Sequence, residues 1–74
     1  MTTDEVKALI EKGLPDCSAE VTDLTGTGDH FSANVTSPAF AGIGLIEQHQ
    51  LVYQALGSLV GGAIHALQLN TKTP

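Results

Sequence analysis

The 74-residue sequence contains no arginine and no tryptophan, and it has only three basic residues against eight acidic ones. The basic residues are Lys7, Lys12 and Lys72, so residues 13–71 carry no basic side chain and the formal net charge is −5. Proteins bind nucleic acids mainly by neutralising phosphates with lysine and arginine. The charge balance therefore argues against a domain that binds DNA or RNA by itself.

The single cysteine, Cys17, excludes an internal disulfide and a metal site built on paired cysteines within this chain. No basic group adjoins it in the sequence, so we interpret it as a half-buried thiol rather than an activated nucleophile. The apolar runs are far shorter than the roughly 20 residues that a membrane-spanning helix needs. The first residues lack the basic and apolar regions of a secretory signal, so we expect a cytoplasmic protein without membrane contact.

Length and composition predict one domain over residues 1–74, with a hydrophobic content of 42% that is ordinary for a globular protein. The catalytic motifs of common enzyme classes are missing. There is no GxSxG nucleophile elbow. Residues 25–29 (TGTGD) resemble a phosphate-binding loop only in their glycines, because the lysine of that motif is absent and a strand follows. We therefore expect a protein that is not an enzyme.

Two helices and one helical turn are predicted. Thr2 and Glu5 form a capping-box pattern ahead of apolar residues at helical spacing, which predicts a helix over residues 3–12. Pro38, after a serine, fits the start of a single helical turn. Residues 45–60 read as the main helix. Its expected apolar stripe consists of Leu45, Ile46, Val52, Leu56, Leu59 and Val60.

Three strands complete the predicted fold. Residues 18–24 and 30–37 form a hairpin around the glycine-rich loop, and residues 63–70 form a third strand after a double glycine. The main helix crosses over between the second and third strands, so these two should run parallel. The sequence therefore predicts an α+β fold of order αββααβ, with a three-stranded mixed sheet and the helices packed on one face.

The histidines are the residues most suited to bind a metal. His30 opens the second strand and His65 lies near the start of the third, where we expect it on one face with Leu67 and Leu69. If those strands are parallel, both rings lie at the same edge of the sheet. Two neutral imidazoles make half of a tetrahedral metal site, so a partner would have to supply the other ligands. The alternatives are a partly buried His65 bonded to the backbone and an exposed loop His30.

The remaining polar candidates are interpreted as structural. His49 lies in the middle of the main helix beside Tyr53, and we expect it to pack against the sheet or to make a hydrogen bond on the helix surface. Asp23 and Asp29 flank the glycine-rich loop, and we interpret them as solvated turn carboxylates.

Three segments in the expected order resemble the BolA family, over nearly the whole chain. They are DHFSANVTSPAFAG (residues 29–42), QHQLVYQAL (48–56) and IHALQLNTKTP (64–74). The resemblance, which is to the bacterial or cyanobacterial type, implies a class II KH-like fold. It also implies a non-enzymatic role in iron–sulfur cluster trafficking, iron homeostasis or redox and stress regulation.

The resemblance further implies a partner and a cofactor. BolA-like proteins pair with monothiol glutaredoxins and share a bridging [2Fe–2S] cluster with them. The nearly invariant histidine of the family corresponds to His65, and His30 matches the second, more variable ligand position. The glutaredoxin cysteine and a glutathione thiol would supply the other ligands, so no cofactor is expected on the isolated chain.

Two alternatives remain open beside this hypothesis. The first is a KH-like transcriptional regulator that binds nucleic acid. It is disfavoured because glutamines, Gln48 and Gln50, stand where many relatives have arginines, and because no GxxG loop joins the helices. The second is a metal-free interaction module that uses the polar face of the second strand. The sequence leaves open whether the chain alone is a monomer or a weak homodimer.

Overall fold

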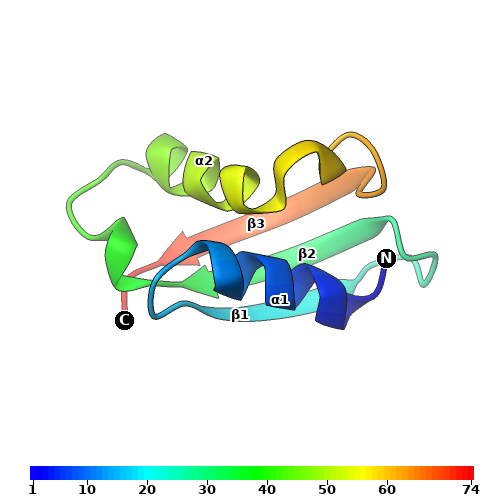
Figure 1. Ribbon diagram of the computed structural model, residues 1–74, viewed down its shortest axis with the longest axis horizontal. Coiled ribbons are helices and arrows are strands. Elements are labelled where there is room, and N and C mark those ends of the chain that lie inside the picture. Colours follow the sequence, from blue (N-terminus) through cyan, green and yellow to red (C-terminus); the bar gives the residue numbers. More distant parts are fainter.

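The computed structural model describes all residues from Met1 to Pro74 and confirms the α+β fold with its three-stranded mixed sheet (Figure 1). A single 3-10 turn stands in the place of the short second helix of the expected order. In chain order the elements are α1 (Thr3–Gly13), β1 (Ser18–Asp23), β2 (His30–Thr36), the 3-10 turn η1 (Pro38–Phe40), α2 (Leu45–Leu56), the 3-10 turn η2 (Gly57–Leu59) and β3 (Ala66–Lys72).

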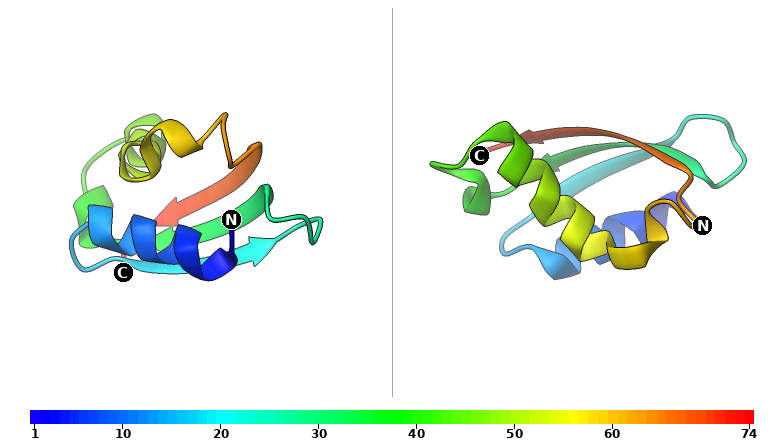
Figure 2. Two further views of the ribbon diagram at one scale, coloured as in Figure 1. Left: turned by 45° about the vertical axis from the view of Figure 1, so that its right-hand side comes forward. Right: turned by 90° about the horizontal axis from the view of Figure 1, so that it is seen from above.

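The sheet has the strand order β1-β2-β3, with β2 in the centre. β1 and β2 pair antiparallel, whereas β2 and β3 pair parallel, as the crossover through α2 predicts. Figure 2 shows both helices on one face of the sheet, which leaves the other face open. Neither helix is long and apolar enough to cross a membrane.

The alternation along β2 decides which side chains enter the core. Phe31, Ala33 and Val35 point toward the helices and are at most 1% exposed. Their neighbours, beginning with His30, therefore lie on the open face, because successive side chains of a strand point to opposite faces. Phe40 in η1 is 1% exposed and closes the core at one end of the sheet.

α1 begins and ends close to where the sequence predicts. The hydroxyl of Thr2 accepts the N–H of Glu5, and the Glu5 carboxylate accepts the N–H of Thr2, so the capping box is present. The helix packs against α2 at Gly13, where a Cβ atom would lie 2.5 Å from the Cβ atom of Ala55. The missing side chain therefore permits the close approach of the two helices.

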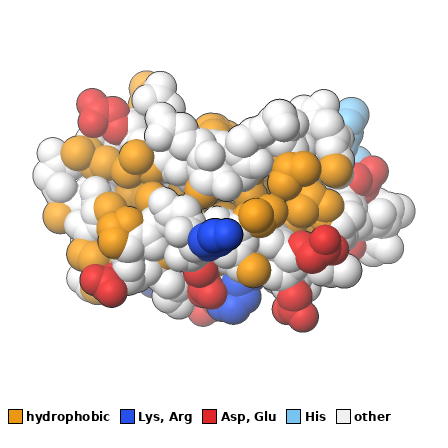
Figure 3. Space-filling model, viewed as in Figure 1, with side chains coloured by type: hydrophobic (Ala, Val, Ile, Leu, Met, Phe, Trp, Pro, Cys, Tyr) orange, Lys and Arg blue, Asp and Glu red, His pale blue; other side chains and the backbone are white.

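The predicted main helix is too long and its apolar stripe is too wide. α2 ends at Leu56, because Gly57 adopts a φ of 62° that L-residues avoid and its N–H donates to the carbonyl of Tyr53. Leu45 is 62% exposed and Ile46 is 76% exposed, so neither belongs to the core. Figure 3 shows apolar atoms at the surface along the junction of the two helices, with a basic side chain among them.

The third strand begins later than the sequence predicts. The turn after η2 ends at Ile64, whose N–H donates to the Leu59 carbonyl at 2.8 Å and whose side chain is fully buried. His65 lies between this anchor and β3, outside the regular strand, and it is exposed. His65 is more exposed than Leu67 and Leu69, with which the sequence predicts it to share a strand face, because it lies outside the regular strand.

Candidate functional site

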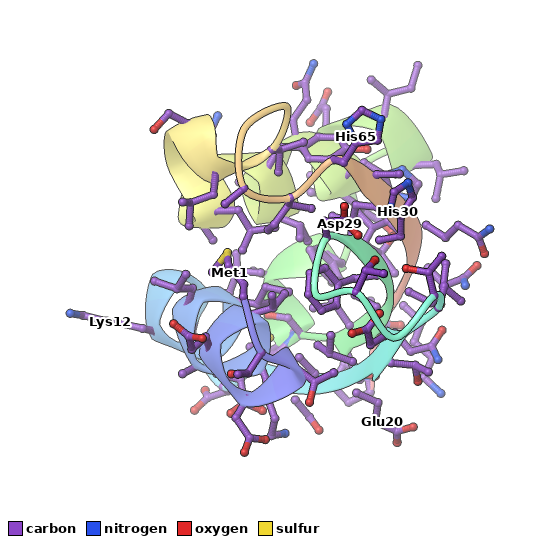
Figure 4. All side chains as sticks on the ribbon, turned by 90° about the vertical axis from the view of Figure 1, so that its right-hand side faces the viewer. Met1, Lys12, Glu20, Asp29, His30 and His65 are labelled. Atoms are coloured by element: carbon purple, nitrogen blue, oxygen red, sulfur yellow. The ribbon has the colours of Figure 1, made fainter.

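The rings of His30 and His65 lie together at one end of the sheet. Their centres are 5.1 Å apart and their planes are inclined by 53°. Figure 4 shows both rings at the surface, with Asp29 beside them. The pairing follows from the parallel register of β2 and β3, in which His30 is the partner of Ala66. The sequence-based expectation that the two rings meet at one sheet edge agrees with this arrangement.

The main chain of Asp29 fixes the position of His65. Its carbonyl oxygen accepts the N–H of His65 at 2.7 Å and the N–H of Ala66 at 3.2 Å. These two bonds join the residue before β2 to the start of β3. Because Ile64 is buried on the preceding side, the His65 side chain projects into solvent at the point where the two strands begin. His65 is thus not the partly buried histidine of the alternative interpretation.

The side chain of Asp29 orients His30. Its Oδ1 lies 2.8 Å from Nδ1 of His30 and also accepts a hydrogen bond from the hydroxyl of Thr27. The hydrogen bonds from Thr27 and His30 hold the pKa of the Asp29 carboxyl below its usual value. The carboxylate is therefore an acceptor at neutral pH, and it favours the His30 tautomer that carries its proton on Nδ1. The lone pair of that tautomer is on Nε2.

The glycine-rich loop is held together by its first aspartate. One carboxylate oxygen of Asp23 accepts the N–H of Gly26 at 2.9 Å, and the other accepts the N–H of Gly28 at 2.9 Å. Both glycines have positive φ, near 75°, which explains the choice of residue. Asp23 and Asp29 are turn carboxylates that remain partly accessible to solvent, as interpreted, but both also accept hydrogen bonds within the loop, which the sequence did not predict. Aspartate at the start of a glycine-rich turn is a known signal for such a bond.

Cys17 and His49 do not belong to the histidine pair. Cys17 precedes β1 at Ser18, which pairs with Thr36 at the far end of β2 from His30. The thiol is half-buried, as predicted, and burial raises its pKa. His49 is half-buried on α2. Its Nε2 is buried without a hydrogen-bond partner, so the expected surface hydrogen bond is not made through this nitrogen.

The donor set at this end of the sheet consists of two imidazoles. His30 is partly exposed, with 35% of its side chain accessible, and His65 is exposed. No group of three or more His, Cys, Asp or Glu side chains in the structure is arranged to hold a metal ion. Two nitrogen donors at an accessible edge suit a metal centre that a second molecule completes.

These features define a class: a small α+β protein with an exposed histidine pair where two parallel strands begin. The family model for BolA-like proteins matches residues 13–74. A solved bolA protein homologue from Coxiella burnetii is 43% identical and has a TM-score of 0.85, with 100% of this chain and 92% of that chain covered. The chain therefore belongs to the BolA-like protein family.

Two further relatives agree with this assignment. The protein RP812 of Rickettsia prowazekii is 30% identical over 71 residues, which cover 96% of this chain and 92% of RP812. The solved BolA domain of SufE1 from Arabidopsis thaliana is 31% identical with a TM-score of 0.82, over 97% of this chain and 91% of that domain. The fold therefore occurs both as a small separate protein and as a domain.

Proposed function

We propose that this protein is a non-enzymatic partner of a monothiol glutaredoxin and that the two proteins hold a [2Fe–2S] cluster between them. His30 and His65 would be the ligands from this chain, and thiolates of the glutaredoxin and of glutathione would complete the site. The observation that carries the proposal is the exposed pair of imidazole rings with centres 5.1 Å apart.

The ring separation fits two histidines on one metal ion. A metal–nitrogen bond to imidazole is about 2.0–2.1 Å, and with the ring centre about 1.1 Å farther out, two rings on one tetrahedral metal have centres about 5.2 Å apart. The separation of 5.1 Å between the ring centres agrees with that value. This separation supports His30 and His65 as two ligands of one iron.

The number of ligands also fits a shared cluster. A [2Fe–2S] cluster needs four protein or thiol ligands, and two histidines can replace the two cysteines on one iron. This chain supplies two donors and its only cysteine lies at the other end of the sheet, so two thiolates must come from elsewhere. When bound, a histidine-ligated cluster has a higher reduction potential than an all-cysteine one and gains ligands that can be protonated. These properties suit cluster transfer or sensing in iron homeostasis.

The proposal is tested by mixing the purified chain with a monothiol glutaredoxin that carries a glutathione-ligated [2Fe–2S] cluster. We expect a new visible absorption and circular dichroism spectrum together with a heterodimer on size-exclusion chromatography. His65→Ala and His30→Ala should each abolish that spectrum. Gln68→Ala, at an exposed position on β3, is the matched control and should leave it unchanged. Retention of the spectrum in both histidine variants would refute the ligand assignment.

A further inference from the structure

The residue between the glycine-rich loop and β2 contacts both halves of the histidine pair. Asp29 bonds to the ring of His30 through its carboxylate and to the backbone of His65 through its carbonyl. His30 is the first residue of β2 and His65 immediately precedes β3, and these two strands pair only through the parallel register. One residue therefore links the two candidate ligands by separate hydrogen bonds.

We infer that Asp29 is the positioning residue of this pair: its carboxylate holds Nδ1–H of His30, so that Nε2 is presented as the metal-binding nitrogen, while its carbonyl sets the place of His65. The inference rests on the proposed function, because it concerns how the same two side chains are prepared for a metal. Histidine ligands in proteins commonly donate their other ring N–H to a carboxylate in this way.

The surroundings of Asp29 show that its carboxylate is itself held in place. The hydroxyl of Thr27 donates to the same Oδ1 that faces His30, and that hydroxyl is 2.5 Å from the hydroxyl of Thr25. The carboxylate of Asp23 accepts the N–H groups of Gly26 and Gly28, on either side of Thr27, and so fixes the backbone there. The loop therefore forms a continuous set of hydrogen bonds that ends at the His30 ring, and little reorganisation is needed when a ligand arrives.

A simpler account is that Asp29 and His30 form an ordinary surface ion pair. The Asp29 side chain is 42% exposed, and exposed pairs of this kind contribute little to stability. An ion pair with no further role would not affect metal binding when it is removed. The two accounts therefore differ in the tautomer of His30 and in the affinity of the bridged complex, and both quantities can be measured.

The first measurement uses the isolated chain with 15N-labelled histidine. Long-range 1H–15N spectra at about pH 8, where an ordinary imidazole is neutral, distinguish the protonated from the unprotonated ring nitrogen. The wild-type chain should show His30 with Nδ1–H and a bare Nε2. Asp29→Ala should lose that preference. Asp29→Asn should keep it, because the amide oxygen can still accept the bond.

The second measurement is a titration of the cluster-loaded glutaredoxin with each variant, followed by visible circular dichroism. We expect Asp29→Ala to weaken the bridged complex by about 10–100-fold, the usual effect of removing such a partner from a metal ligand. Asp29→Asn should stay close to wild type, and Thr27→Val, which removes a donor to the same oxygen, should lie between. Glu20→Ala, which removes an exposed carboxylate on β1 far from the rings (Figure 4), is the control and should have no effect.

The outcomes separate the two proposals. Suppose that Asp29→Ala binds with wild-type affinity and keeps the His30 tautomer, whereas His30→Ala loses the complex. That result would overturn the positioning role of Asp29 and leave the shared cluster standing. If the spectrum of the bridged cluster survives in both His30→Ala and His65→Ala, the proposal of a shared cluster is refuted. The inference that Asp29 prepares these ligands is then refuted as well. Should Asp29→Ala prove poorly folded, Thr27→Val and Asp29→Asn still decide the matter, since the first must weaken the complex and the second must not.

Discussion

The backbone N–H of His65 donates to the carbonyl oxygen of Asp29 at 2.7 Å. This bond joins the two histidine-bearing segments at the residues that immediately precede β2 and β3. The same aspartate contacts the His30 ring through its side chain. A parallel strand pair cannot be closed by a tight turn, and here the crossover through α2 separates the two segments along the chain. The candidate site therefore depends on long-range structure and not on a local motif.

The close approach of the two helices at Gly13 makes a stability prediction. Gly13→Ala should lower the free energy of unfolding by about 1–3 kcal/mol, because the new methyl group would lie 2.5 Å from Cβ of Ala55 and backbone must move. Urea unfolding followed by circular dichroism measures the change. In an Ala55→Gly background the same substitution should cost less, because only the Cα atom of residue 55, at 3.0 Å, would still lie close to the new methyl group. A destabilisation of equal size in both backgrounds would contradict the contact as the cause.

Glu11 makes a pH-dependent contribution to stability. Its carboxylate accepts hydrogen bonds from Nζ of Lys7 at 2.9 Å and from the N–H of Ala19 at 3.0 Å, and these bonds lower the pKa of Glu11. A depressed carboxyl pKa stabilises the fold above the ordinary pKa, and this contribution is lost as the pH falls through the lowered value.

Thermal unfolding of Glu11→Gln tests this contribution. The variant should melt below wild type near neutral pH, and the difference should shrink as the pH falls through the lowered pKa of Glu11, where the wild-type carboxylate also becomes protonated. Glu20→Gln removes an exposed carboxylate on β1 that makes no hydrogen bond in the structure and serves as the control. A melting difference that stays constant down to low pH would show that Glu11 contributes through packing instead.

Cys17 should be a slow nucleophile. Burial raises the pKa of its thiol, and the nearby Glu11 carboxylate acts in the same direction, so little thiolate is present at neutral pH. Iodoacetamide should modify the folded chain more slowly than it modifies glutathione, and unfolding in urea should remove the difference. Cys17→Ser should leave the bridged cluster spectrum unchanged, because the thiol lies at the opposite end of the sheet from His30. Rapid alkylation of the folded chain would contradict this assignment.

The isolated chain should not bind nucleic acid. Three basic residues against eight acidic ones leave almost no capacity to neutralise phosphates. Phosphate-driven binding is strongest at low salt, so a mobility-shift titration with duplex DNA at about 50 mM salt is the most permissive test. No shift is expected at protein concentrations of tens of micromolar. A shift that disappears with rising salt would favour the transcriptional-regulator hypothesis.

Local signals in the sequence predict much of this fold. The capping box at Thr2, the alternation around Phe31 and the glycines after Asp23 are each confirmed because the physics behind them is short-range. The end of α2 is mispredicted because the apolar pattern continues past Gly57, whose positive φ ends the helix. Sequence periodicity does not register a change of backbone conformation at a single residue.

The candidate site is predictable only in part. Topology suffices to bring His30 and His65 to one edge, once the crossover is recognised. The role of Asp29 could not be found in that way, because its carbonyl and carboxylate act on residues that meet only when β3 docks beside β2. Its position beside a glycine-rich turn is compatible with either a solvated or a bonded carboxylate.

The most direct test of the central claim is to count histidine nitrogens on the iron. The 15N-histidine-labelled chain would be combined with unlabelled glutaredoxin and glutathione, and the reduced [2Fe–2S] complex would be studied by pulsed electron paramagnetic resonance. The account predicts two strongly coupled histidine nitrogens, one of which is lost in any complex that His30→Ala or His65→Ala still forms. A reduced cluster in this complex with no strongly coupled histidine nitrogen would contradict it.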